Sequence, residues 1–406
     1  MINLTVEEAA AVLGVKPATL YAYVSRGRLT RVRTPEGSRF DAAEVERLAR
    51  SSRRALAAGG APVGFASELT FIEGGRYYYR GVDAVALSRS AGLEEVTGWL
   101  WEAVRDDGSG PWEAPPGPLR AAGAACAALQ PSTSPTDRWK LAVAAASSVD
   151  PLRHDRAPAT VTAIARGLVA TLVEVLPVAA QRAGGPASRS LATRLWPRLS
   201  PLPATAAQVA CLDAALVLLA DHEIAASTLA ARTAAAVGAD PYAVVLTGMS
   251  AAGGPLHAGN SLRVRPILAD TARFGAPAAL GDLLGRGGQL HGFGHPLYPD
   301  GDPRAAELLD RLRSTGADMD AVDALLQLAA ARGTPPPNVD LALAALAHTH
   351  LMIPGASEAI FVLARTVGWI GHALEEYTRR SQFRVRATYM GPRPGEERGA
   401  IRSAAT

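Results

Sequence analysis

Apolar residues recur at helical spacing over most of the chain. From about residue 121 to residue 382, runs of alanine, leucine and valine follow the 3.6-residue period of helices that bury one face. No stretch of about 18 residues lacks charged or polar breaks, so no transmembrane helix is expected. The pattern predicts a mainly helical body.

The first 24 residues predict two short helices of their own. Thr5 and Glu8 have the spacing of a capping box, and the helix that they open ends at Gly14. Pro17 suits the first turn of a second helix over residues 18–24. Two short helices joined by a turn that contains glycine are typical of a helix-turn-helix unit.

A hairpin and a third helix are predicted next. Residues 29–33 alternate like a strand, residues 35–38 have the composition of a turn, and residues 39–40 begin the returning strand. Residues 41–48 open with a second capping pattern, which predicts a helix. Residues 51–61 have the composition of a linker, so the small N-terminal domain is placed at residues 1–54.

Charge is distributed unevenly between this segment and the rest. The whole chain carries a formal charge of +3, of which residues 1–54 contribute +4 and the remainder −1. A local basic excess suits a polyanionic partner, although scattered surface charge would give the same number. The charge alone therefore does not decide between DNA and a solvated surface.

Together, these features resemble the winged helix-turn-helix module of excisionases and MerR-type regulators over about residues 3–50. The resemblance implies DNA binding, with side chains of the second helix at base edges and arginines of the hairpin region at phosphates. The candidates are Thr19, Tyr21 and Tyr23, and Arg26, Arg28, Arg31, Arg33 and Arg39. The alternative is a small helical appendage used for protein contacts.

Several common kinds of site lack the residues that they need. Cys126 and Cys211 are far apart, so neither a disulfide framework nor a cysteine zinc site is expected. His291 and His295 are separated by glycines, which disfavours a metal site on a helix face, and no metal is expected. The chain has no phosphate-binding loop and no nucleophile elbow, and its glycine pattern around Phe293 lacks the third glycine of a dinucleotide fingerprint.

The N-terminus lacks the basic segment of a secretory signal, so a cytoplasmic location is expected.

Three histidines lie in unusual surroundings. His222 stands between two acidic residues after an apolar run, whereas His257 and His295 lie in segments rich in glycine and proline. Such segments hold a side chain on a fixed loop and allow a ligand to approach the backbone closely. Arg304 follows nine residues after His295. A lone histidine in a helical protein is usually structural, but this grouping suggests a binding site.

Six motifs, in this order, resemble the citrate synthase family over about residues 62–395. They are Ala220-Asp221-His222-Glu223 with Ser227-Thr228, Gly254-Pro255-Leu256-His257, Gly292-Phe293-Gly294-His295 with Asp302-Pro303-Arg304, Pro337-Asn338-Val339-Asp340, residues 364–370, and Arg384-Val385-Arg386 before Tyr389-Met390-Gly391-Pro392. The segments Tyr79-Arg80-Gly81 and Leu93-Glu94-Glu95-Val96 match the N-terminal region of the family.

The resemblance implies an all-α citrate synthase fold, in which a small domain closes over substrate bound to a large one. The large domain would comprise residues 62–258 and 351–406, and the small domain residues 259–350. It also implies a homodimer, no permanent cofactor and two substrates, oxaloacetate and acetyl-CoA or another acyl-CoA. No membrane partner is expected.

By the same resemblance, Asp340 is the base that removes a proton from the acyl-CoA. His257 donates a hydrogen bond to the thioester oxygen, and His295 donates one to the oxo group of oxaloacetate. Arg304, Arg365 and Arg384 are expected to bind the carboxylates with help from His222, because guanidinium groups match carboxylates in geometry. The alternative for Asp340 is a helix N-cap after Pro337-Asn338, and for each arginine an ordinary ion pair.

Some positions depart from the family's usual pattern. Pro299 stands where a basic residue often faces the CoA phosphates, and Pro296 where arginine often follows the third histidine. Leu219 replaces a frequent histidine, and the segment Ala258-Gly259-Asn260 is one residue shorter than usual. The changes fall mainly on the acyl-CoA side.

Three functions therefore remain open. The first is an acyl-CoA:oxaloacetate condensing enzyme, a citrate or 2-methylcitrate synthase-like acyltransferase with a fused DNA-binding module. The second is a transcriptional regulator whose synthase-like body senses a metabolite. The third is a structural module without either activity. The set of His257, His295 and Asp340 favours the first, whereas the added module and Pro299 favour the second.

Overall fold

The computed structural model describes residues 3–13, 20, 24, 29–34, 37–42, 44–45, 65–102, 112–179 and 190–379. These residues belong to two compact units, one within residues 1–65 and a body within residues 66–382. Each unit is described by itself.

In its described residues, the N-terminal unit contains the helix α1 and a small antiparallel sheet in the order β1-β3-β2. Its elements are β1 (Asn3–Leu4), α1 (Val6–Leu13), β2 (Arg31–Thr34) and β3 (Gly37–Asp41). The predicted hairpin is confirmed, since Arg31 pairs with Phe40 and Thr34 with Gly37. Apolar side chains from these elements and from three further positions form a separate small core: Ala9, Ala10, Leu20, Leu29, Phe40 and Val45.

Both predicted N-terminal caps are present. The Thr5 amide donates to Glu8 Oε2 over 2.8 Å, and the Glu8 amide donates to Thr5 Oγ1 over 3.2 Å, which completes the capping box before α1. The Glu44 amide donates to Asp41 Oδ1 over 2.9 Å. Most of the predicted second helix lies outside the described residues, with Thr19, Tyr21, Tyr23, Arg26 and Arg28.

The body begins with a small antiparallel sheet that the sequence pattern did not predict. It consists of β4 (Thr70–Glu73), β5 (Arg76–Tyr79) and β6 (Val82–Asp83). Tyr77 and Tyr79 on β5 are buried, and their hydroxyls donate to the carbonyl oxygens of Leu218 (3.1 Å) and Val217 (2.9 Å). The sheet is thereby fixed to the end of a long apolar helix.

The rest of the described body is helical, as predicted. Its helices are α4 (Ala84–Ser90), α5 (Leu93–Glu102), α6 (Pro116–Cys126), α7 (Pro135–Val149), α8 (Pro158–Glu174), α9 (Leu191–Leu199), α10 (Ala206–Leu219), α11 (Ala226–Ala236), α12 (Pro241–Ala252), the 3₁₀ helix η1 (Ala258–Arg263), α13 (Val264–Phe274), α14 (Ala276–Gly285), α15 (Pro303–Ser314), α16 (Asp320–Ala331), α17 (Val339–Thr349) and α18 (Ala356–Tyr377).

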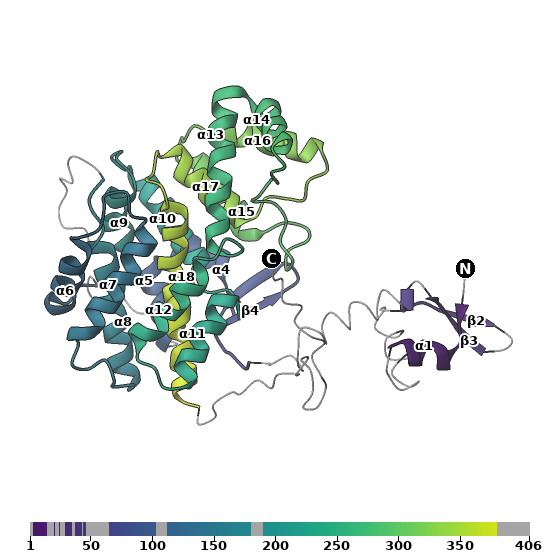
Figure 1. Cartoon of the computed structure of the whole chain (residues 1–406), viewed down its shortest axis with the longest axis horizontal. Helices are drawn as coiled ribbons and strands as arrows, with labels where there is room; N and C mark the ends of the chain where they lie inside the picture. Colours follow the sequence, from purple (N-terminus) through teal and green to yellow (C-terminus); the bar gives the residue numbers. More distant parts are fainter. Residues whose placement is uncertain are drawn as a thin grey trace, which may run out of the picture. The chain divides into compact units, whose positions relative to one another are not determined.

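Helix α18 forms the centre of the body. It runs among α10, α11, α12 and α8 (Figure 1), and nearly all of its 22 residues are buried. A helix that is surrounded on all sides can bury polar residues only where they find partners. Its buried Arg365, Arg232 on α11 and the nearby carboxylates are therefore notable exceptions to an otherwise apolar interior.

Helices α13 to α17 form a second group within the body (Figure 1). Helix α13 contacts α14, α16 and α17, and α15 lies between α17 and α10. Most of the predicted small domain lies in this group, and its boundaries at residues 259 and 350 remain a prediction. The arrangement places the N-termini of α15 and α17 next to the loops that carry the histidines.

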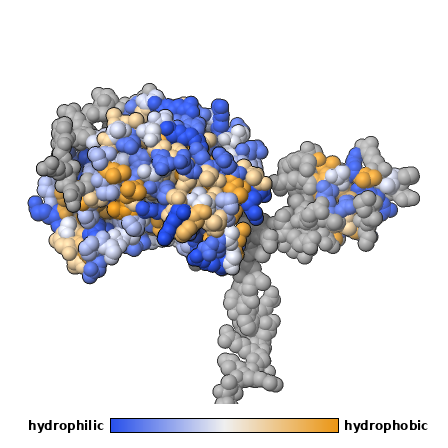
Figure 2. Space-filling view, turned by 90° about the horizontal axis from the view of Figure 1, so that it is seen from above, coloured by the Kyte–Doolittle hydropathy of each residue, from blue (hydrophilic) through white to orange (hydrophobic). Residues whose placement is uncertain are grey.

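The surface of the body mixes hydrophilic side chains with apolar patches on the face drawn in Figure 2. Among the described residues, no helix has both the length and the apolar character needed to cross a bilayer. Cys126 and Cys211 are buried and unbonded to each other.

Candidate active site

A pocket of about 360 Å³ lies where α15, α17, α18 and the histidine loops meet. Six of the predicted residues line it: His222, His257, His295, Arg304, Asp340 and Arg365. The other lining residues are mostly small or apolar: Ala225, Ala226, Leu256, Asn260, Gly294, Pro296, Asn338, Val339 and Phe361. Arg384, the seventh predicted residue, lies outside the described part of the chain.

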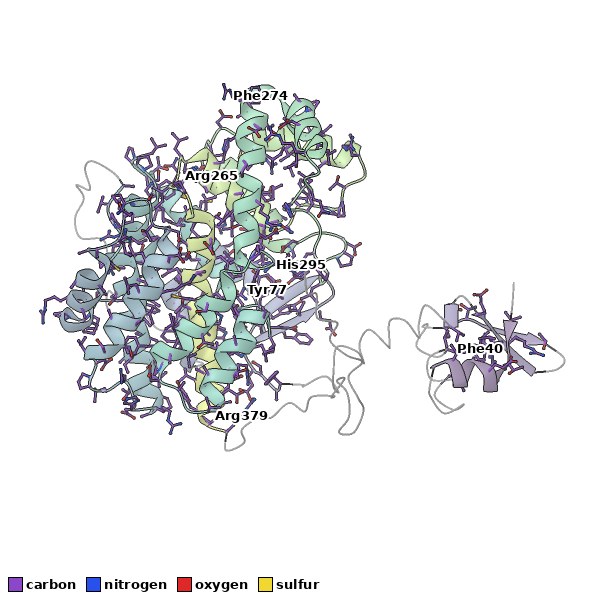
Figure 3. All side chains as sticks on the ribbon, in the orientation of Figure 1. Phe40, Tyr77, Arg265, Phe274, His295 and Arg379 are labelled. Atoms are coloured by element: carbon purple, nitrogen blue, oxygen red, sulfur yellow. The ribbon has the colours of Figure 1, made fainter. Side chains whose placement is uncertain are left out.

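His222 is positioned by the end of α10. The Tyr79 hydroxyl accepts a hydrogen bond from the Asp221 amide over 3.2 Å, which fixes the backbone just before the histidine. Glu223 then has a φ of 51°, so the chain turns sharply after His222. The buried His222 Nε2 lies 2.7 Å from the Tyr298 hydroxyl. His222 and His295 rings meet edge to face at 5.6 Å, on the side of the body where Figure 3 labels Tyr77 and His295.

His257 is oriented by a serine. Its Nε2 lies 2.8 Å from Ser227 Oγ, which also accepts a hydrogen bond from Trp369 Nε1 over 3.3 Å. Because an indole N–H can only donate, the hydrogen of the buried Ser227 hydroxyl has one acceptor among the described residues, the His257 Nε2. The ring proton of His257 is therefore assigned to Nδ1, where it can act as a donor.

His295 lies on a loop that two glycines shape. Gly292 and Gly294 have φ values of 88° and 72°, a region that favours glycine. An added Cβ on Gly292 would come within 2.9 Å of Leu341 Cβ, so the loop lies directly on α17. The Leu297 amide donates to His295 Nδ1 over 3.2 Å, which assigns the ring proton to Nε2.

All three histidines are held neutral by their surroundings. Burial, helped by Arg365, lowers the pKa of His257 to about 4. Burial lowers the pKa of His295, and the positive charge of Arg304 adds to this effect. Burial also lowers the pKa of His222, to well below its usual value, and the charges of Arg304 and Arg365 contribute. Neutral imidazoles donate hydrogen bonds without adding positive charge to the pocket.

Asp340 stands in the first turn of α17. The N-cap of this helix is Asn338, whose Oδ1 accepts from the Asp340 amide over 3.0 Å, so the alternative interpretation of Asp340 as the N-cap is wrong. Asn260 Nδ2 donates to Asp340 Oδ2 over 2.7 Å. Burial raises the pKa of Asp340 to about 6, against the opposing effect of Asn260. A carboxylate with this pKa is ionised at neutral pH and more basic than usual.

Arg304 is paired with an aspartate from its own helix cap. Its Nε and Nη2 donate to Asp302 Oδ1 (2.9 Å) and Oδ2 (2.8 Å), and both side chains are at most 3% exposed. Asp302 Oδ2 also accepts from the Val339 amide over 3.0 Å. Asp302 therefore joins the N-termini of α15 and α17 and fixes Arg304 between them.

Arg365 has a different environment. It is 1% exposed, its Nε donates to the Leu219 carbonyl over 2.9 Å, and its guanidinium lies 4.9 Å from the centre of the Phe361 ring. Within the described part of the chain, no carboxylate lies within ion-pair distance of it. Burial lowers the pKa of Arg365, although a guanidinium remains charged. Asp221 acts on Arg365 electrostatically without forming an ion pair, so an anion in the pocket would be its direct ion-pair partner.

The pocket thus combines one basic carboxylate, three neutral imidazoles and two buried guanidinium groups. This arrangement can remove a weakly acidic proton, donate hydrogen bonds to developing negative charge and bind a carboxylate-bearing ligand. Among the described residues, no group of three or more His, Cys, Asp or Glu side chains could hold a metal ion.

Three functional candidates did not emerge from the sequence. Ser227, Asp302 and Asn260 were present in the motifs, but no role followed from their spacing alone. Their partners lie 30, 37 and 80 residues away, at His257, at Val339 and at Asp340. Only the fold brings these pairs together, so no local signal could have found them.

The N-terminal candidates that the structure describes lie on the hairpin. Arg31 pairs with Phe40, which is buried, whereas Arg39 pairs with Val32, which is 50% exposed. Directly paired residues share a sheet face, so Arg31 and Arg39 lie on opposite faces of the hairpin. Arg33 pairs with Ser38 on β3. A partner that contacts only one face of the hairpin therefore cannot bind both Arg31 and Arg39.

Comparison with known families identifies two parts of the chain. Residues 61–386 match the family described as citrate synthase, C-terminal domain. The chain belongs to the citrate synthase family. Residues 4–53 separately match the family described as helix-turn-helix domain.

Curated relatives of this citrate synthase family member match over part of their length. Citrate synthase 2 of Bacillus subtilis is 32% identical over 192 residues, which cover 46% of this chain and 52% of the relative. 2-Methylcitrate synthase 1 of Corynebacterium glutamicum is 29% identical over 187 residues, 44% of this chain and 49% of the relative. The chain thus spans about half the length of the curated relatives it matches.

Solved structures show the same fold. Citrate synthase from Thermotoga maritima has a TM-score of 0.63 and 22% identity, covering 82% of this chain and 95% of that chain. Citrate synthase from Thermoplasma acidophilum, described as a ternary complex with carboxymethyl coenzyme A and oxaloacetate, has a TM-score of 0.62 and 20% identity, covering 86% and 98%. The predicted all-α citrate synthase fold is confirmed.

Proposed function

We propose that this chain condenses an acyl-CoA with oxaloacetate and releases CoA. The observation that carries the proposal is the single pocket that brings Asp340, His257 and His295 together with two buried arginines. The family membership of the chain supports it. The relatives' names include both citrate and 2-methylcitrate synthases, so acetyl-CoA and propionyl-CoA are both candidate substrates.

The first step is removal of a proton from the carbon next to the thioester carbonyl. Asp340 accepts this proton, and the negative charge moves to the thioester oxygen, where the Nδ1–H of His257 donates a hydrogen bond. A carboxylate alone is too weak a base, so the step depends on this donor. A positioned base contributes roughly 10²–10⁴-fold, and a donor to the oxyanion a similar factor.

The second step forms a carbon–carbon bond. The enolate carbon attacks the oxo carbon of oxaloacetate, and the oxo oxygen takes a proton from the Nε2–H of His295. Arg365 and Arg304 bind the carboxylates of oxaloacetate, and His222 with Tyr298 stands beside them. Water then cleaves the thioester of the condensed product, which yields a tricarboxylic acid and free CoA.

A steady-state assay tests this function. Purified full-length protein is given acetyl-CoA or propionyl-CoA with oxaloacetate, and release of the CoA thiol is followed. We expect release that requires both substrates, with a preference between the two thioesters. Release at the same rate without oxaloacetate would mean simple thioester hydrolysis, and no release with either thioester would contradict the proposal.

We further propose that the N-terminal unit binds DNA. Its match to a helix-turn-helix family, its local charge of +4 and its β2–β3 hairpin support this. A metabolite-sensing regulator without turnover is the weaker alternative, because such a protein would not need the basic carboxylate of Asp340 beside a hydrogen-bond donor.

Assembly into a homodimer remains a prediction of the family resemblance, and light scattering tests it.

A further inference from the structure

Asn260 makes a contact that the mechanism above does not use. It lies on η1, directly after the His257 loop, and its side-chain amide donates to Asp340 Oδ2 over 2.7 Å. Both side chains are partly buried and line the same pocket. A hydrogen bond to an ionised carboxylate in such a place is stronger than one at the surface.

The backbone of Asn260 is hydrogen-bonded to that of His257, a second proposed catalytic residue. Its amide donates to the His257 carbonyl over 2.9 Å, which closes a tight turn between the two residues. This turn is possible because Ala258 and Gly259 are the only residues between them. An added Cβ on Gly259 would come within 3.1 Å of the Gly254 carbonyl oxygen, so the loop is closely packed. One residue therefore connects the position of His257 with that of Asp340.

The contact also distinguishes the two oxygens of Asp340. Oδ2 is occupied by Asn260, whereas Oδ1 has no hydrogen-bond partner among the described residues. A carboxylate free to rotate would present either oxygen in several orientations. With Oδ2 held, Oδ1 is the oxygen that remains available to take a proton from a substrate.

We propose that Asn260 is a positioning residue for the condensation. It holds Asp340 by one oxygen, directs the other oxygen to the acyl-CoA, and fixes the position of this base relative to His257. This inference rests on the proposed function for its consequences in turnover, but the hydrogen bond and its effect on Asp340 exist without turnover. Its chemistry is that of an amide donor that stabilises the ionised form of a partly buried base.

Removal of Asn260 changes one of several influences on the titration of Asp340. The charged and titratable groups around it come from five different segments: Arg304 on α15 with its N-cap Asp302, Arg365 on α18, His295 on its loop, His222 after α10, and His257 before η1. Arg304 lowers the pKa of Asp340 and Asp302 raises it. None of these groups is replaced in Asn260→Ala, so a movement of the titration in that variant reports the lost amide.

The test compares kcat against pH for the full-length wild type, Asn260→Ala and Asn260→Asp. We expect Asn260→Ala to lower kcat about tenfold or more through loss of orientation, with the KM for oxaloacetate nearly unchanged. Its acid limb should move upward by roughly half a pH unit to one unit, because the ionised base has lost a donor. Asn260→Asp should move the limb further, since two carboxylates would then be adjacent.

Ser261→Ala is the matched control. Ser261 is the next residue of η1, and its buried hydroxyl bonds Ala258 and Ser357 but not Asp340. If Asn260 only stabilises η1, both alanine variants will lower kcat and melting temperature alike, and neither will move the acid limb. That outcome would overturn the inference.

A second measurement works without turnover. Aspartate labelled with ¹³C at the side-chain carboxyl is introduced, and the signal that disappears in Asp340→Asn identifies Asp340. Its titration midpoint should be higher in Asn260→Ala than in wild type. An unchanged midpoint would overturn the inference even in an inactive protein, whereas an inactive wild type with a shifted midpoint would contradict only the proposed function.

Discussion

At the scale of single residues, burial sets the chemistry of the pocket. Asp340 has a pKa of about 6 because burial disfavours its charged form, and it must be ionised to act as the base. We therefore expect kcat to be level above neutrality and to fall about tenfold per unit as the pH drops below about 6. His257, with a pKa of about 4, stays neutral throughout. A kcat profile that stays level down to about pH 5 would remove Asp340 from this role.

The two buried arginines should respond differently to substrate. No carboxylate in the described part of the chain lies within ion-pair distance of Arg365, so a carboxylate of oxaloacetate would be its direct ion-pair partner. Arg365→Ala should weaken oxaloacetate binding by about 1–3 kcal/mol and leave acyl-CoA binding nearly unchanged. Calorimetry with each ligand measures this. Arg286→Ala, which removes an exposed surface ion pair on α14, serves as control and should change neither affinity. Equal oxaloacetate affinity in wild type and Arg365→Ala would contradict the assignment.

At the scale of elements, the His295 loop is held against α17 by a glycine that tolerates no side chain. Gly292 has a φ of 88°, and an added Cβ would lie within 2.9 Å of Val264 and Leu341. Gly287 has a φ of 73° with no atom within 4 Å of an added Cβ. Gly287→Ala should cost about 1–2 kcal/mol in the free energy of unfolding from backbone strain alone. Gly292→Ala should cost roughly 2–4 kcal/mol, since crowding adds to strain, and should reduce turnover. Equal losses in denaturant titrations would mean that the contact with α17 is unimportant.

The elements also show which features a sequence can predict. The capping box of Thr5 and Glu8 was predictable because both partners lie within one helical turn. The pocket residues were predictable as a set because several motifs with the family's order occur together. The small sheet of β4 to β6 was missed, because its strands are short and pair only with each other. Asn260 and Asp302 were missed as functional residues, because their contacts join segments that only the tertiary fold brings together.

At the scale of the whole molecule, the two units should be separable. The N-terminal unit has its own core and caps, and every proposed catalytic residue belongs to the body. A chain that begins at Ala61 should fold and keep the turnover of the full protein. It should lose DNA binding, and the binding of the full chain should weaken steeply with salt as phosphate counterions are released. A salt titration with genomic fragments, beside the CoA assay, measures both. Loss of folding on truncation would show that the N-terminal unit is part of the synthase body.

The central claim is that this pocket forms a carbon–carbon bond with Asp340 as the base. The most direct test gives full-length wild type and Asp340→Asn acetyl-CoA labelled with ¹³C in its acetyl group, together with oxaloacetate, and analyses the products by mass spectrometry. Both proteins should bind oxaloacetate with similar affinity. The wild type should release CoA and place both labelled carbons in a six-carbon tricarboxylic acid, and the variant should do so at least about 10²-fold more slowly. Labelled acetate as the sole product, or equal rates in the two proteins, would contradict the account.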